Sequence, residues 1–272
     1  MLPVVVIILS WSCGGKSGTV SDNSTNKNTK SNNTEISVEL QPILKQRTSK
    51  TVRVLYDDYF KSPKEYLGYD LLPLLDSIIK SQSFDTTKSV IIFECHDGYK
   101  PSLPIGKLYD KVKPYIVFKD LTAKGDTNWN DSIRDKFNPY YLVWDSAKEG
   151  DHSFVWPYGL VSITLRSMEA QNKLIYPFNN PALVAGFNLF RANCMKCHAI
   201  NGVGGSMAPE FNFPKNITEY WRGDDIIAFA TNPNSYRRNS AMPAVTSISQ
   251  SDYKEIILYL KYMKDYKANN GL

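Results

Sequence analysis

Cysteine and histidine are scarce in this 272-residue chain, which contains four cysteines and three histidines. A structural zinc site normally takes four such ligands from two closely spaced pairs. The chain has a single closely spaced cysteine pair, Cys194 and Cys197, and the next cysteine, Cys95, lies far upstream. The shortage therefore argues against a structural zinc site.

Long apolar runs are also missing. The run at residues 2–9 is too short to span a bilayer, and the polar tract that follows it is typical of an export signal. Cys13 ends this stretch and resembles the acylated cysteine of a bacterial lipoprotein. We therefore predict a signal segment at 1–13 and an extracytoplasmic, periplasmic protein anchored in the membrane through a lipid on Cys13. Plain signal cleavage and a misassigned start are the alternatives.

Apolar side chains are nearly absent from residues 14–40, which are mostly Gly, Ser, Thr, Asn and Lys. Such a segment cannot bury a core, so we expect a disordered tether there. The net charge of +5 is spread over tether and surface lysines, and no nucleic-acid-binding motif accompanies it. We therefore expect no nucleic-acid partner.

Cys194, Met195, Lys196, Cys197 and His198 form a C-x-x-C-H run, the pattern at which a c-type haem is attached. Two thiols three residues apart lie on one side of a helical turn, where both can add to the vinyl groups of one porphyrin. The histidine then falls beneath the ring and can offer a nitrogen to the iron. The run therefore predicts one covalently attached haem c.

The flanks of this run support the prediction. Apolar residues recur at helical spacing from Pro181 up to the run, and Gly202, Gly204 and Gly205 after it permit tight turns beside a flat ligand. Near the end of the chain, Ser249 is a good helix cap before a second amphipathic stretch. Two helices are therefore expected to enclose the haem.

Residues 181–272 resemble a small bacterial monohaem cytochrome c domain. The likeness rests on G-x-x-L-F before C-x-x-C-H, a glycine loop ending in proline, an M-P pair and a last helix carrying Y-L. It implies an all-α domain in which the histidine and Met242 are the two axial iron ligands. It also implies that the carbonyl of Pro209 accepts the proton of the histidine ring.

The same resemblance implies where the first and last helices cross. Gly186 and Phe190 would meet Tyr259 and Leu260.

Met207 is the rival sixth ligand, but it lies nine residues beyond His198, on the loop expected to cover the histidine side of the ring, from which the opposite face is hard to reach. We therefore favour Met242 and expect Met207 to fill space. An iron held by histidine and methionine has no free position, which suits single-electron transfer.

Residues 45–170 form a second predicted domain. Strand-like runs and one helix-like run predict an α+β domain with a mixed or antiparallel sheet. The strand-like runs occupy residues 51–60, 89–99, 114–121, 140–145 and 159–165, and the helix-like run occupies residues 69–82.

The order of these runs resembles the molybdopterin-binding fold of the sulfite oxidase group over about residues 50–168. The most specific element is D-G-Y at residues 97–99 followed shortly by L-P. Members of that group hold molybdenum through an upstream cysteine, and residues 40–70 contain none. We therefore expect a cofactor-free version, without molybdopterin.

Cys95 and His96 remain as a polar cluster of this domain, with His152 the only other histidine there. One cysteine and two histidines without defined spacing favour a structural role over a metal or redox site.

Together these features predict an electron carrier that has no catalytic residues of its own. Its redox protein partners could be a terminal oxidase, a nitrogen-oxide reductase or a molybdoenzyme. The alternative is an oxidoreductase of the molybdopterin type, in which the first domain transforms a small substrate and passes electrons to the haem.

Overall fold

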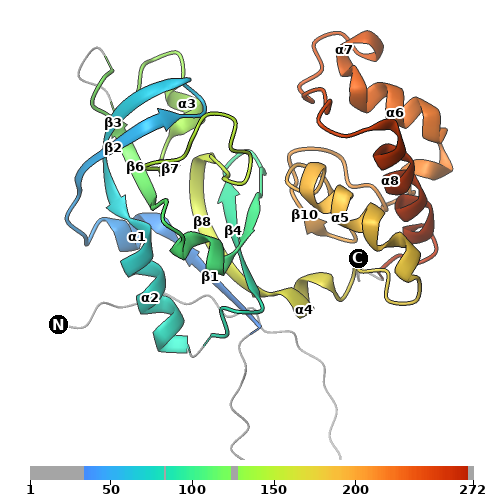
Figure 1. The fold of residues 1–272 in the computed structure, drawn as a ribbon, viewed down its shortest axis with the longest axis horizontal. Helices are drawn as coiled ribbons and strands as arrows, with labels where there is room; N and C mark the ends of the chain where they lie inside the picture. Colours follow the sequence, from blue (N-terminus) through green and yellow to red (C-terminus); the bar gives the residue numbers. More distant parts are fainter. Residues whose placement is uncertain (1–33, 83, 124–127, 269–272) are drawn as a thin grey trace, which may run out of the picture.

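A computed structural model describes residues 34–82, 84–123 and 128–268 of the chain. They form a sheet domain followed by a smaller C-terminal domain, which lie side by side in Figure 1. Helix α4 (Met168–Asn172) begins at the Ser167 cap and leads from one domain to the other. The predicted signal segment and Cys13 lie outside the described residues. Among the helices that the structure describes, none is both long and apolar enough to cross a membrane.

The sheet domain is built on eight strands that pair antiparallel throughout. Seven follow the order β2-β3-β6-β7-β8-β4-β5, and β1 pairs with β8. The strands are β1 (Glu35–Glu39), β2 (Lys50–Asp57), β3 (Ser62–Asp70), β4 (Ser89–Cys95), β5 (Ser102–Pro104), β6 (Pro114–Asp120), β7 (Tyr140–Trp144) and β8 (Tyr158–Ser167).

Four short helical elements accompany the sheet, besides α4. They are α1 (Leu40–Leu44), α2 (Leu71–Gln82), the 3-10 helix η1 (Ile105–Tyr109) and α3 (Arg134–Phe137). The sheet curves into a half-barrel (Figure 1), and the amide of Leu55 in β2 donates to the carbonyl of Asp145 just after β7 at 2.9 Å.

Both faces of the sheet are covered. In β7, Tyr140, Leu142 and Trp144 enter the larger core beneath α1 and α2. The alternate residues, Tyr141 and Val143, enter a second, aromatic-rich core on the other face. Every residue of β7 is therefore buried, which explains why this strand reads as a continuous apolar run.

The α+β assignment of this domain, with its likeness to the molybdopterin-binding fold, is wrong, because the domain is a large antiparallel half-barrel. The predicted strands and the helix at α2 are present, but three further strands, β1, β3 and β5, make the domain mainly β-sheet. One of them, β1, occupies Glu35–Glu39, where the sequence predicted tether. Only Val38 of this strand is buried, opposite Ile163 of β8, so its own sequence reads as polar coil.

The C-terminal domain contains short helices and a small β-ribbon. Its elements are the 3-10 helix η2 (Pro181–Leu183), α5 (Val184–Asn193), β9 (Ala199–Ile200), β10 (Val203–Gly204), the 3-10 helix η3 (Ile217–Glu219), α6 (Gly223–Thr231), α7 (Pro233–Tyr236) and α8 (Gln250–Met263). Helix α8 begins at the predicted Ser249 cap, which forms a reciprocal capping box with Asp252.

Helices α5 and α8 cross at Gly186. A Cβ atom added there would lie 2.1 Å from the carbonyl oxygen of Glu255 and 3.1 Å from the Cβ of Tyr259. One turn further along α5, the ring of Phe190 packs against the ring of Tyr259 at a centroid distance of 5.6 Å. The predicted crossing of these helices is confirmed.

The prediction of an all-α C-terminal domain is wrong. Strands β9 and β10 pair antiparallel, and residues 237–249 contain no helix. The ribbon turns at Asn201 and Gly202, whose φ angles are 53° and 74°. Two successive positive φ angles define the tight hairpin turn that Asn-Gly favours, so a local signal for this ribbon was present in the sequence.

Candidate haem-attachment site

The C-x-x-C-H residues form a tight turn at the end of α5. The amide of Cys194 donates to the carbonyl of Phe190 at 2.8 Å, which extends the helical bonding to the first cysteine. The amide of His198 then donates to the carbonyl of Cys194 at 3.0 Å. This turn brings Cys194, Cys197 and His198 together, and both cysteines are free thiols.

His198 is held by a single well-defined hydrogen bond. Its Nδ1 lies 2.7 Å from the carbonyl oxygen of Pro209, and its ring stacks on Phe211 with centroids 4.1 Å apart. A carbonyl oxygen can only accept, so Nδ1 carries the proton and Nε2 keeps a lone pair for a metal. Burial lowers the pKa of His198, although the bond to Pro209 opposes the shift. The imidazole is therefore a neutral, oriented donor.

The segment after His198 folds back over the turn; we call residues 194–209 the attachment loop. The amide of Gly205 donates to the carbonyl of Met195 at 2.8 Å, and that of Ala208 donates to the carbonyl of Cys197 at 3.0 Å. A Cβ at Gly205 would lie 2.3 Å from the carbonyl oxygen of Lys196. Glycine is thus required there by the close approach of two backbone segments.

Burial raises the pKa of Cys194 to about 12, and it also raises the pKa of Cys197. Both side chains are therefore neutral thiols at neutral pH. Among the residues that the structure describes, no group of three His, Cys, Asp or Glu side chains could hold a metal ion. The pair thus lacks the partners of a zinc site, whereas a porphyrin requires only the two thiols and the histidine.

The two candidate methionines lie on different segments. Met207 belongs to the attachment loop, and its residue is 46% exposed. Met242 belongs to the segment of residues 237–249 and is partly buried. That segment is fastened at Val245, whose amide donates to the carbonyl of Ala230 at 2.9 Å and whose carbonyl accepts from the hydroxyl of Tyr253. Met242 therefore lies on a segment held against α6 and α8.

Three buried asparagines, whose role no local sequence pattern predicted, tie the attachment loop and its continuation to α8. Asn212 Nδ2 donates to Asn201 Oδ1 and to the carbonyl of Met263, both at 2.8 Å. Asn216 Nδ2 donates to Asn212 Oδ1 at 2.8 Å and to the carbonyl of Leu260 at 2.9 Å. These bonds give second donors to carbonyls at the end of α8, which also accept from the backbone amides of Lys264 and Tyr266.

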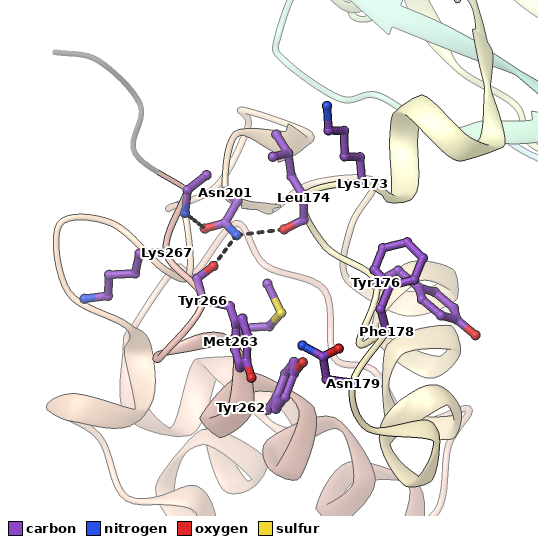
Figure 2. Close-up of a pocket in the computed structure, with 11 residues that line it drawn as sticks. Lys173, Leu174, Tyr176, Phe178, Asn179, Asn201, Tyr262, Met263, Tyr266 and Lys267 are labelled. Carbon is purple, nitrogen blue, oxygen red and sulfur yellow. Dashed lines mark hydrogen bonds between the residues drawn. The ribbon is translucent and has the colours of Figure 1, made fainter.

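The three asparagines are joined side chain to side chain, as an asparagine ladder, and Figure 2 shows its third member, Asn201. Asn201 Nδ2 donates to the carbonyls of Leu174 and Tyr266, each at 2.8 Å. The adjoining pocket is lined by aromatic residues that include Tyr262 and Tyr266, whose rings stack at 4.2 Å. No residue of the C-x-x-C-H run lines it, so the pocket is separate from the attachment site.

The cluster of Cys95, His96 and His152 fits its structural interpretation. Cys95 is buried in the large core, and burial raises its thiol pKa. The ring of His96 lies over Gly159, where an added Cβ would come within 2.5 Å of Nε2. His152 lies on a separate exposed turn.

Comparison with known proteins bears on the C-terminal domain. Residues 181–260 match the family described as cytochrome c oxidase, cbb3-type, subunit III. These residues form a cytochrome c domain. Cytochrome c oxidase subunit 2 of Alkalihalophilus pseudofirmus is 33% identical over 85 residues, which cover 29% of this chain and 25% of that protein. The similarity thus spans a quarter of that relative.

A cytochrome c domain implies a haem c and a haem-based electron-transfer role. The residues present fit such a group, because two free thiols and an oriented imidazole converge on one turn.

Proposed function

We propose that this protein is an extracytoplasmic electron carrier with one haem c. Cys194 and Cys197 bind the porphyrin covalently, and His198 and Met242 are the axial ligands of the iron. The observation that carries the proposal is the bond between His198 Nδ1 and the Pro209 carbonyl, within the attachment loop that also holds both thiols. That bond leaves Nε2 free for the metal and fixes the ring orientation.

Each group of the site has one task. The haem iron supplies one-electron chemistry by alternating between its ferric and ferrous states. Pro209 and Phe211 keep the imidazole of His198 from turning, and the asparagine ladder holds the surrounding loop against α8. Such a rigid frame keeps the ligands in place in both redox states, which favours rapid electron exchange.

The two similarities support a respiratory setting. Both the matching family and the Alkalihalophilus relative carry cytochrome c oxidase in their names. We therefore propose a terminal oxidase as the redox partner and a location outside the cytoplasm, where such partners meet soluble carriers. A lipid on Cys13 would keep the protein beside a membrane-bound oxidase.

Haem content tests the proposal directly. Protein produced in a host that attaches haem c should carry one iron per chain, in a porphyrin that remains bound after acid extraction. Replacement of both thiols, Cys194→Ala with Cys197→Ala, should abolish covalent haem, because the thioether bonds cannot form. The matched control is Cys95→Ala, which removes a cysteine from the other domain and should leave haem content unchanged.

Metal analysis of the same samples separates the carrier from the molybdopterin-type oxidoreductase. Iron at one per chain without molybdenum supports electron transfer alone. Stoichiometric molybdenum, or covalent haem that survives loss of both thiols, would refute the proposed assignment.

A further inference from the structure

A turn of the sheet domain is bonded to the attachment loop of the cytochrome c domain. The turn, residues 97–100, connects β4 to β5. The amide of Lys100 donates to the carbonyl of Lys196 at 2.8 Å, and the amide of Ser206 donates to the carbonyl of Gly98 at 2.9 Å. Figure 1 shows β10 and its loop on the side of their domain that faces the sheet.

Gly98 is essential to this contact for two reasons. Its φ angle is +86°, which side chains rarely tolerate. An added Cβ would lie 2.7 Å from Ser206 Oγ and 2.8 Å from the amide nitrogen of Met207. The two backbones therefore meet so closely that only glycine fits.

The cysteine of the attachment loop that borders this turn is Cys197. The carbonyl of Lys196, the residue just before Cys197, accepts one of the two inter-domain hydrogen bonds. Burial is the main cause that raises the pKa of Tyr99, and the nearby Cys197 and Cys95 raise it further. Asp97 in turn contributes to the raised pKa of Cys197. Asp97 and Tyr99 of the turn thus lie near the second haem-attachment thiol, beside the Lys100–Lys196 hydrogen bond.

We propose that residues 97–100 are a clamp that fastens the sheet domain over the Cys197 side of the haem and shields that edge from water and from external redox partners. The inference rests on the proposed haem attachment and assigns a task to the sheet domain. With the clamp closed, electron partners must reach the haem along another edge.

The clamp makes two properties of the haem depend on Gly98. Loss of one or two of the backbone hydrogen bonds of the clamp should shift the equilibrium between its closed and open forms by about tenfold towards the open form. An opened edge admits small reductants and water. Since water stabilises the more highly charged ferric state, opening should also lower the midpoint potential.

The test compares Gly98→Ala with Gly150→Ala in the haem-loaded protein. Gly150 has a similar φ angle of +75° but has no atom within 4 Å of an added Cβ, so its variant controls for backbone strain alone. Three quantities are measured: amide exchange at Lys100 and Ser206, the rate of haem reduction by ascorbate, and the midpoint potential. Gly98→Ala should speed exchange and reduction by about tenfold and lower the potential. Gly150→Ala should match the parent.

Two results would overturn the clamp. Faster exchange with an unchanged reduction rate and potential would show that the contact does not shield the haem. Exchange as slow as in the parent would show that the contact does not depend on Gly98.

Ser206→Pro provides a second variant if Gly98→Ala folds poorly, because it removes one donated N–H without adding a side chain at Gly98. It should reproduce the faster reduction, and a parental rate would count against the clamp. Haem content is measured first in every sample. Absence of covalent haem in the parent would refute the proposed function, whereas a failed clamp leaves that haem in place.

Discussion

His198 and the buried asparagines show which residue-level features a sequence can reveal. The C-x-x-C-H spacing is local and chemically restrictive, so the candidate attachment residues could be predicted from five consecutive positions. Asn212 and Asn216 are fully buried, yet their partners include the carbonyls of Met263 and Leu260, more than forty positions away. A polar residue in a loop normally predicts a solvated turn, so its burial follows only from the tertiary structure.

Replacement of Met242 tests the proposed sixth ligand. A thioether bound to ferric haem gives a weak absorption band in the far red, and Met242→Ala should abolish it because no other sulfur replaces the lost one. The midpoint potential should fall as well, since methionine ligation favours the ferrous state. Optical spectra and redox titration of the haem-loaded variant provide the measurement.

Met207→Ala is the matched control for this test. Met207 is exposed on the attachment loop, so its removal should leave both the band and the potential unchanged. A band that persists in Met242→Ala and disappears in Met207→Ala would reverse the ligand assignment.

At the scale of elements, a helix or strand could be predicted where the sequence pattern that specifies it lies within the segment itself. Helix α8 was predictable because its cap and apolar stripe are local, and both are present. Strands β1 and β3 were missed because β1 has one buried residue and β3 mixes polar with apolar side chains on a curved sheet. Their strand character comes from pairing with β8 and β6, which a local pattern does not contain.

The crossing of α5 and α8 should be intolerant of any side chain at Gly186. Alanine normally favours a helix by up to about 1 kcal/mol over glycine. Here its Cβ would press on the backbone carbonyl of Glu255, which cannot rotate away, and such overpacking costs about 1–3 kcal/mol. Gly186→Ala should therefore lower the free energy of unfolding of the C-terminal domain, measured by denaturant titration.

Gly106→Ala is the control for that substitution, because no atom lies within 4 Å of the position its Cβ would take. It should leave stability nearly unchanged. If Gly186→Ala were as stable as the parent, the two helices would have to cross with more space than the structure shows.

At the scale of the whole molecule, the two domains have separate hydrophobic cores. The sheet domain buries one core on each face, and the C-terminal domain packs its own around α5 and α8. The clamp at residues 97–100 joins the domains through two backbone hydrogen bonds, each worth about 1 kcal/mol net. Such weak coupling should allow each domain to unfold as its own cooperative unit.

Calorimetry should therefore resolve two transitions, of which only one responds to haem. A covalently attached group stabilises the domain whose folded state binds it. The haem-free variant Cys194→Ala with Cys197→Ala should lower the transition of the C-terminal domain by many degrees and leave that of the sheet domain in place. A single transition that moves as a whole would mean that the clamp couples the domains far more strongly than two hydrogen bonds can, and that the sheet domain needs the haem domain to fold.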